Sequence, residues 1–157
     1  MRTAVVAALA VLAVGAGSAV ALAAGTQFTT LQATLVPEGD PDGSGAAVIT
    51  IDFKDSGTIC PVRIEVENVA RPITGAAITV GESSEFVGRI FIQDRGGVIE
   101  DGLCTSQGGI KTRDLKRIQK DPGAHFLHLY NAEHPCDIFS TGPCPPGAVI
   151  GQLEGVS

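Results

Sequence analysis

The chain has 157 residues, 44% of them hydrophobic, and a formal net charge of −6 from 17 acidic and 11 basic side chains. This length accommodates one ordinary domain plus a processing segment. The acidic balance argues against nucleic acid and anionic membrane surfaces as partners, because both are bound through cationic patches. It favours solubility and selects no substrate.

The N-terminal segment predicts a secretory signal peptide. Arg2 precedes an uncharged apolar run that ends in small residues, and Ala21-Leu22-Ala23 fits an A-x-A cleavage site. We therefore expect a leader over residues 1–24 and a secreted or extracytoplasmic domain over residues 25–157. The run from Thr3 to Gly25 could also just span a bilayer, so a domain tethered through an uncleaved N-terminus is the alternative.

Short segments rich in β-branched or alternating apolar residues, separated by Gly, Pro and Asp turns, predict antiparallel strands. In one strand Ala47, Ile49, Ile51 and Phe53 share a face, which we expect to be buried. Alternation is cleaner in Pro61–Val69, where Val62, Ile64 and Val66 point one way. The expected strands are Phe28–Val36, Ala46–Phe53, Pro61–Val69, Ile73–Val80, Val87–Gln93, His125–Tyr130 and Ala148–Leu153. This pattern indicates an all-β fold, an antiparallel Greek-key sandwich or barrel of the superoxide dismutase-like or Ig-like kind.

The turn between the first two expected strands contains candidates for weak calcium binding. Asp40, Asp42 and Ser44 occupy positions 1, 3 and 5 of an EF-hand-like loop. Position 12 should be a bidentate Glu but is Ile51, and no helix precedes the loop. A tight turn between strands explains the same residues.

One segment departs from the strand pattern. In Thr112–Lys120, Leu115 and Ile118 lie three positions apart, and Asp121-Pro122-Gly123 would end a helix. We expect a short helix there, capped by Thr112 or Asp114, with a basic and solvated outer side.

Four cysteines in an exported chain predict two disulfides, for which three pairings exist. No close C-x-x-C pair supports a metal site of the zinc-finger kind. Cys136 and Cys144 lie eight positions apart in a long connection between the last two expected strands, and a bond between them would close a small loop. By elimination, Cys60 would pair with Cys104.

The sequence shows no credible catalytic site, and we expect neither enzymatic activity nor a cofactor. It has no G-x-S-x-G motif and no glycine-rich phosphate loop opening a helix. His125 and His128 would face opposite sides of a strand and could not chelate a metal together. His128 and His134 could meet near the last loop, together with Glu133.

Four blocks in order resemble the chordin-type domain family, CHRD. They are LVPEGDPDGSGAAVITI at residues 35–51, GTICPVRIEV at residues 57–66, PITGAAITVG at residues 72–81, and the closing segment from Ile118 to Leu153. The resemblance implies an exported antiparallel β domain of poorly defined function. It also implies a cysteine pair at Cys60 and Cys104, as in some members.

The chain departs from the family pattern at the histidine and arginine positions that could bind a ligand or a metal. A His-x-His strand is usual in the third block, but Ala77 and Thr79 stand at those positions. The late strand usually ends Asn-x-His and here reads His128-Leu129-Tyr130, and Ile150 replaces a usual Arg. The paired imidazoles that could hold a metal in such a strand are therefore missing.

These observations predict a secreted, non-enzymatic binding or structural module of unknown ligand, with a protein or an extracellular polymer as partner. A disulfide-closed loop over residues 131–147 is the expected contact, because a constrained loop loses little entropy on binding. A degenerate metal-binding, superoxide dismutase-like protein is the alternative, and it requires three histidine or carboxylate ligands within about 5 Å. Candidate contact residues are His134, Asp137, Ile138 and Phe139.

Overall fold

The computed structural model describes residues 29–52, 58–82, 85–90, 92, 94, 96, 99–100, 110–136 and 144–156. Over these residues the chain is an antiparallel β protein with one short α-helix, as its sequence predicts. The elements are β1 (Thr30–Pro37), β2 (Ser44–Asp52), β3 (Thr58–Glu67), β4 (Ile73–Val80), β5 (Glu85–Ile90), β6 (Ile99–Glu100), α1 (Thr112–Lys120), the 3₁₀ turn η1 (Pro122–Ala124), β7 (His125–Asn131), β8 (Val149–Gln152) and β9 (Glu154–Val156).

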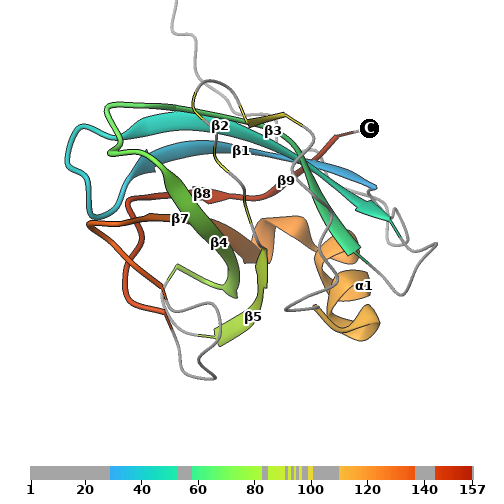
Figure 1. Cartoon of the computed structure of the whole chain (residues 1–157). Coiled ribbons are helices and arrows are strands. Elements are labelled where there is room, and N and C mark those ends of the chain that lie inside the picture. The colour runs from blue at the N-terminus through green and yellow to red at the C-terminus, as the bar shows by residue number, and fades with distance from the viewer. Residues whose placement is uncertain are drawn as a thin grey trace, which may run out of the picture.

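The strands form one curled sheet in the order β5-β4-β7-β8-β1-β2-β3-β6, and β9 pairs with β1. The sheet folds over at β1, because residues 30–35 of β1 pair with β2 whereas Val36 and Pro37 pair with β8. As a result β2 and β3 lie in one layer and β4, β7 and β8 in the other (Figure 1). The expectation of an antiparallel sandwich or barrel is confirmed, in the form of a half-barrel.

The period-two pattern of the sequence directs one face of each long strand into the space between the layers. In β1, Leu31, Ala33 and Leu35 are buried while the intervening residues are exposed. On β2, Ala47, Ile49 and Ile51 are buried as predicted, and Phe53 lies outside the described residues. Among the described residues the central core cluster is aliphatic, and Tyr130 is buried beside it. The largest fully buried aliphatic members are Leu31, Leu35, Ile49, Ile64, Ile73, Ile78, Leu115, Ile118, Leu127, Leu129 and Leu153.

Helix α1 has the predicted bounds and anchors. Leu115 and Ile118 are fully buried, and the basic side chains of the helix face solvent. The predicted caps are wrong: the N-cap is Lys111, without a side-chain cap. Asp114 instead lies within the first turn. There its carboxylate pairs with Arg113 at 3.1 Å. The positive end of the helix dipole also stabilises an acidic side chain in the first turn.

Several predictions extend beyond the described residues. These include the leader over residues 1–24, Cys104, and the contact candidates Asp137, Ile138 and Phe139. Within the described part of the chain, no helix is long and apolar enough to cross a membrane.

Candidate functional site

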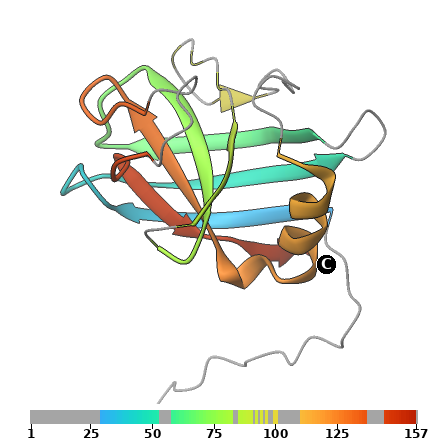
Figure 2. The same ribbon diagram turned by 90° about the horizontal axis from the view of Figure 1, so that it is seen from below.

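A cluster of polar side chains lies among three connections of the chain. These connections meet at the end of the molecule opposite α1 (Figures 1 and 2). They are the turn after β1 (residues 38–43), the segment after β7 (132–136) and the segment before β8 (144–148). The backbone N–H groups of Glu38, Gly39 and Asp40 all donate to the carbonyl oxygen of Ala148, at 3.0–3.1 Å. This shared acceptor fixes the first connection against the third.

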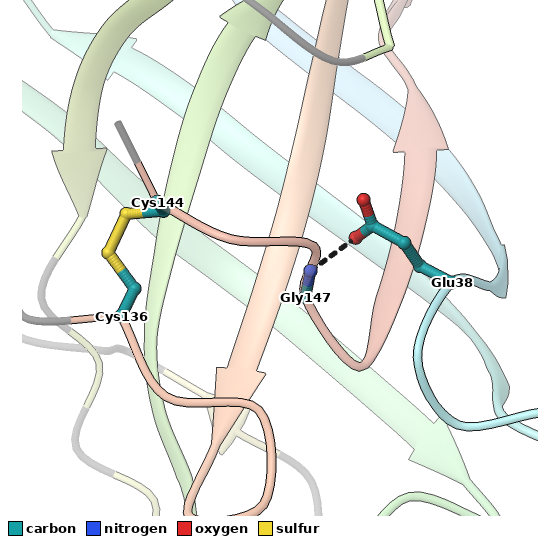
Figure 3. Close-up of a disulfide and its surroundings, with 4 residues drawn as sticks. All are labelled: Glu38, Cys136, Cys144 and Gly147. Atoms are coloured by element: carbon teal, nitrogen blue, oxygen red, sulfur yellow. Dashed lines mark hydrogen bonds between the residues drawn. A yellow bond between two sulfur atoms is a disulfide. The ribbon is translucent and has the colours of Figure 1, made fainter. Parts of the chain in front are cut away.

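The disulfide predicted between Cys136 and Cys144 is confirmed, with the two Cα atoms 5.2 Å apart. Figure 3 shows it joining the segment that leaves β7 to the segment that returns to β8. Three residues beyond Cys144, the N–H of Gly147 donates to Glu38 Oε2 at 2.7 Å (Figure 3). Because Cys104 lies outside the described residues, its pairing with Cys60 stays a prediction.

The first of two histidine–carboxylate pairs joins His128 to Glu38. Nδ1 of His128 lies 2.9 Å from Glu38 Oε2, and since a carboxylate only accepts, the imidazole N–H donates. Nε2 lies 3.0 Å from Oγ1 of Thr79 on the neighbouring strand β4. The ring of His128 also stacks with Tyr130, their centroids 6.4 Å apart. His128 is 3% exposed, so the imidazole of this pair is closed to solvent.

The row Thr79–His128–Glu38 has the order of a hydroxyl, a base and an orienting acid. In a catalytic triad the hydroxyl proton is directed at the imidazole. Here Thr79 Oγ1 donates to the carbonyl oxygen of Gly81 at 2.7 Å instead. Burial raises the pKa of the adjacent Tyr130 phenol well above its ordinary value, and the Glu38 charge adds to this effect. The hydroxyl proton of Thr79 is therefore directed away from the imidazole, and the Tyr130 phenol stays protonated at neutral pH.

The second pair joins His134 to Asp40. His134 Nε2 lies 2.9 Å from Asp40 Oδ1, and the His134 side chain is 27% exposed. A Cβ on Gly39 would lie 2.4 Å from Nδ1 and Cε1 of His134, so the absent side chain of this glycine makes room for the ring. The Asp40 carboxylate therefore bonds to the segment after β7.

Asn131, the last residue of β7, holds the second pair in place and is fully buried. Its Oδ1 accepts from the backbone N–H groups of Glu133 and His134, at 3.0 and 2.8 Å. Its Nδ2 donates to Asp40 Oδ2 at 3.3 Å and to the carbonyl oxygen of Ala70 at 3.0 Å. One amide therefore sets the turn that carries His134 and binds the acid opposite it.

Glu133 completes a group of three metal-ligating side chains. One donor atom each from Asp40, Glu133 and His134 lie within 4.8 Å of one another. Asp40 and Glu133 also line an open pocket of about 580 Å³, together with Asp42. The sequence predicted that His128 and His134 would meet, together with Glu133. The structure brings Glu133 and His134 together with Asp40, whereas His128 bonds to Glu38.

The other predicted residues are placed as follows. Asp40 and Asp42 lie in the turn, and Ser44 begins β2 opposite Glu67. His125 bonds through Nδ1 to the carbonyl oxygen of Asp121, away from His128, as expected for opposite faces of a strand. Sequence reasoning missed Glu38, Thr79 and Asn131. The available signal was an acidic turn and two histidines far along the chain, and their pairing depends on the fold, in which β1 and β7 both pair with β8.

Comparison with models of protein families, with curated proteins and with solved structures found no match.

Proposed function

We propose that the chain is an exported, non-enzymatic binding module of the CHRD kind that contacts a protein or an extracellular polymer. The contact surface is the segment over residues 131–147, whose described parts, residues 131–136 and 144–147, are joined by the disulfide and lie at the end of the sheet opposite α1. Export rests on the leader-like residues 1–24 and agrees with the disulfide, since such bonds persist in oxidising compartments.

One observation carries the proposal: both stems of this segment are fixed to the turn after β1. On the first stem, Asn131 and His134 bond to Asp40. On the second stem, Gly147 bonds to Glu38. With the disulfide between them, the two stems are held in place before a partner arrives, which lowers the entropic cost of binding there.

The described polar residues favour binding over catalysis. The row that resembles a triad is closed to solvent at His128, and the Thr79 proton is directed to a backbone carbonyl. A nucleophile needs a base that can take its proton and a site that a substrate can reach.

The alternative form of the proposal is a domain tethered to the membrane by its N-terminus. It differs in attachment and shares the same contact surface.

The test is capture of a partner from the envelope and medium of the producing cells, using immobilised protein with intact disulfides. A Cys136→Ser/Cys144→Ser double variant opens the segment, and Lys116→Ala on α1 is a control at the other end of the molecule. Folding of each variant is checked by circular dichroism and its urea midpoint.

We expect the wild type and Lys116→Ala to retain the same specific partner and the double variant to lose at least about tenfold in affinity. Equal retention by the folded double variant would overturn the assignment of the surface. N-terminal sequencing of exported protein separates the two forms of attachment, because an intact Met1 means a tethered domain.

A further inference from the structure

The geometry points to a binding site for a divalent transition-metal ion of the zinc class, formed by Asp40, Glu133 and His134. The site lies beside the contact surface proposed above, but it needs no partner and stands on its own geometry.

The donor set is mixed, and its atoms lie close enough together to converge on one ion. An imidazole nitrogen and two carboxylate oxygens lie within 4.8 Å of one another. Two donors about 2.1 Å from a tetrahedral zinc ion lie about 3.4 Å apart, so the 2.9 Å between His134 Nε2 and Asp40 Oδ1 has to widen by about 0.5 Å when an ion enters. An ion can therefore replace the shared proton with small side-chain movements.

The surroundings hold the ligands in place before any ion binds. Asn131 fixes the backbone of Glu133 and His134 and donates to the Asp40 oxygen that His134 does not use. The ring of His134 is seated over Gly39, where a side chain would collide with it. Such outer contacts orient first ligands and raise metal affinity, commonly by about 10–100-fold.

The site is also accessible. Glu133 is exposed, and the pocket of about 580 Å³ that Asp40 and Glu133 line opens to solvent. Asp42 lines the same pocket and adds negative charge. Three protein ligands beside open space leave room for water to complete the shell.

The imidazole decides the class of ion. Ca²⁺ and Mg²⁺ prefer shells made of oxygen alone, whereas zinc and its neighbours accept imidazole nitrogen with carboxylate oxygen. The calcium loop predicted from sequence would use Asp40, Asp42 and Ser44, but the Asp40 carboxylate is directed to His134 and Asn131. We therefore expect Zn²⁺ to bind in preference to Ca²⁺.

The experiment is calorimetric titration of the metal-free chain, with its disulfides intact, using Zn²⁺ and then Ca²⁺. Glu133→Gln is the decisive variant, because the Glu133 side chain is exposed and its backbone bond to Asn131 is unchanged. Glu82→Gln removes one equally exposed charge from the turn after β4 and is the matched control. Co²⁺ serves as a coloured probe of imidazole coordination in each protein.

We expect one Zn²⁺ per chain, an affinity at least about tenfold weaker in Glu133→Gln, and no change in Glu82→Gln. Gly39→Ala should weaken binding without removing a ligand. Absence of stoichiometric Zn²⁺ binding, tighter binding of Ca²⁺, or equal losses in the two Glu→Gln variants would overturn the site. If the chain binds no Zn²⁺ but still captures a partner, the metal site is wrong and the proposed function is retained. If it binds Zn²⁺ but captures no partner, the proposed function is wrong and the metal site is retained.

Discussion

Two histidine–carboxylate pairs stand side by side in this molecule, and they differ in what surrounds them. Both acids come from one turn, as Glu38 and Asp40, and each lies 2.9 Å from an imidazole nitrogen. His128 is buried and both its ring nitrogens have protein partners, whereas His134 is partly exposed and has Glu133 nearby. The same chemical pair is therefore a structural tie when closed and a potential ligand set when open.

The position of each histidine on the backbone explains the difference. His128 lies inside β7, opposite Ala77 on β4 and Ile150 on β8, so neighbouring strands surround it. His134 lies three residues past the end of β7, in a turn that Asn131 organises. A residue in such a turn can hold a fixed side chain and still face solvent.

Glu38→Ala should give the largest effect and would break the closed pair. It removes the acceptor of both His128 and Gly147 and leaves their N–H groups buried without a partner. We expect the free energy of unfolding to fall by about 3 kcal/mol, measured by urea denaturation. Glu38→Gln keeps one carbonyl acceptor and should lose less; an equal loss in both variants would show that the side chain only fills space.

Asn131→Ala should be next in size and acts on the open pair. It deletes four hydrogen bonds of a fully buried amide, including those to Glu133 and His134. We expect a loss of about 2 kcal/mol in the free energy of unfolding and faster hydrogen exchange at residues 132–136. Unchanged exchange there would contradict the role given to Asn131.

Asp94 belongs to neither pair, and its ionisation makes the free energy of unfolding depend on pH. Burial raises the pKa of its carboxyl. Hydrogen bonds from Arg71, Ile73 and Gly96 and the charge of Arg71 lower it by more, so its pKa lies below the ordinary 3.8. The stabilisation is therefore full above about pH 4 and is lost as the pH falls through the lowered pKa.

Asp94→Asn should destabilise the protein by about 1 kcal/mol at pH 7 and flatten the loss of stability on acidification. Urea midpoints between pH 6 and about pH 2 measure both effects. A variant as acid-sensitive as the wild type would mean that other carboxylates dominate acid unfolding.

Glu133→Gln should change stability least, by less than about 0.5 kcal/mol, because the side chain is exposed. A small change in stability would mean that Glu133 contributes to metal binding and not to the fold, unlike Glu38. The measurement is the urea midpoint in metal-free buffer. A loss above 1 kcal/mol, the order of one structural hydrogen bond, would place Glu133 with Glu38 as a structural residue.

Local patterns predicted the elements well and the polar site only in part. Alternation at Ala47, Ile49 and Ile51, and the spacing of Leu115 and Ile118, report burial directly, so the strands and the helix follow from them. The partners of the histidines depend on contacts 90 and 94 positions apart in sequence, which no local pattern encodes. The short disulfide was predictable because its cysteines are near neighbours in the chain.

The contrast between the pairs is tested most directly by titrating Zn²⁺ into the protein while following the imidazole signals of its three histidines by NMR. The ring signals of His134 should shift at one equivalent, while those of His128 and His125 stay in place. Shifts at His128, or no shift at His134 after a full equivalent of metal, would contradict the distinction between a closed and an open pair.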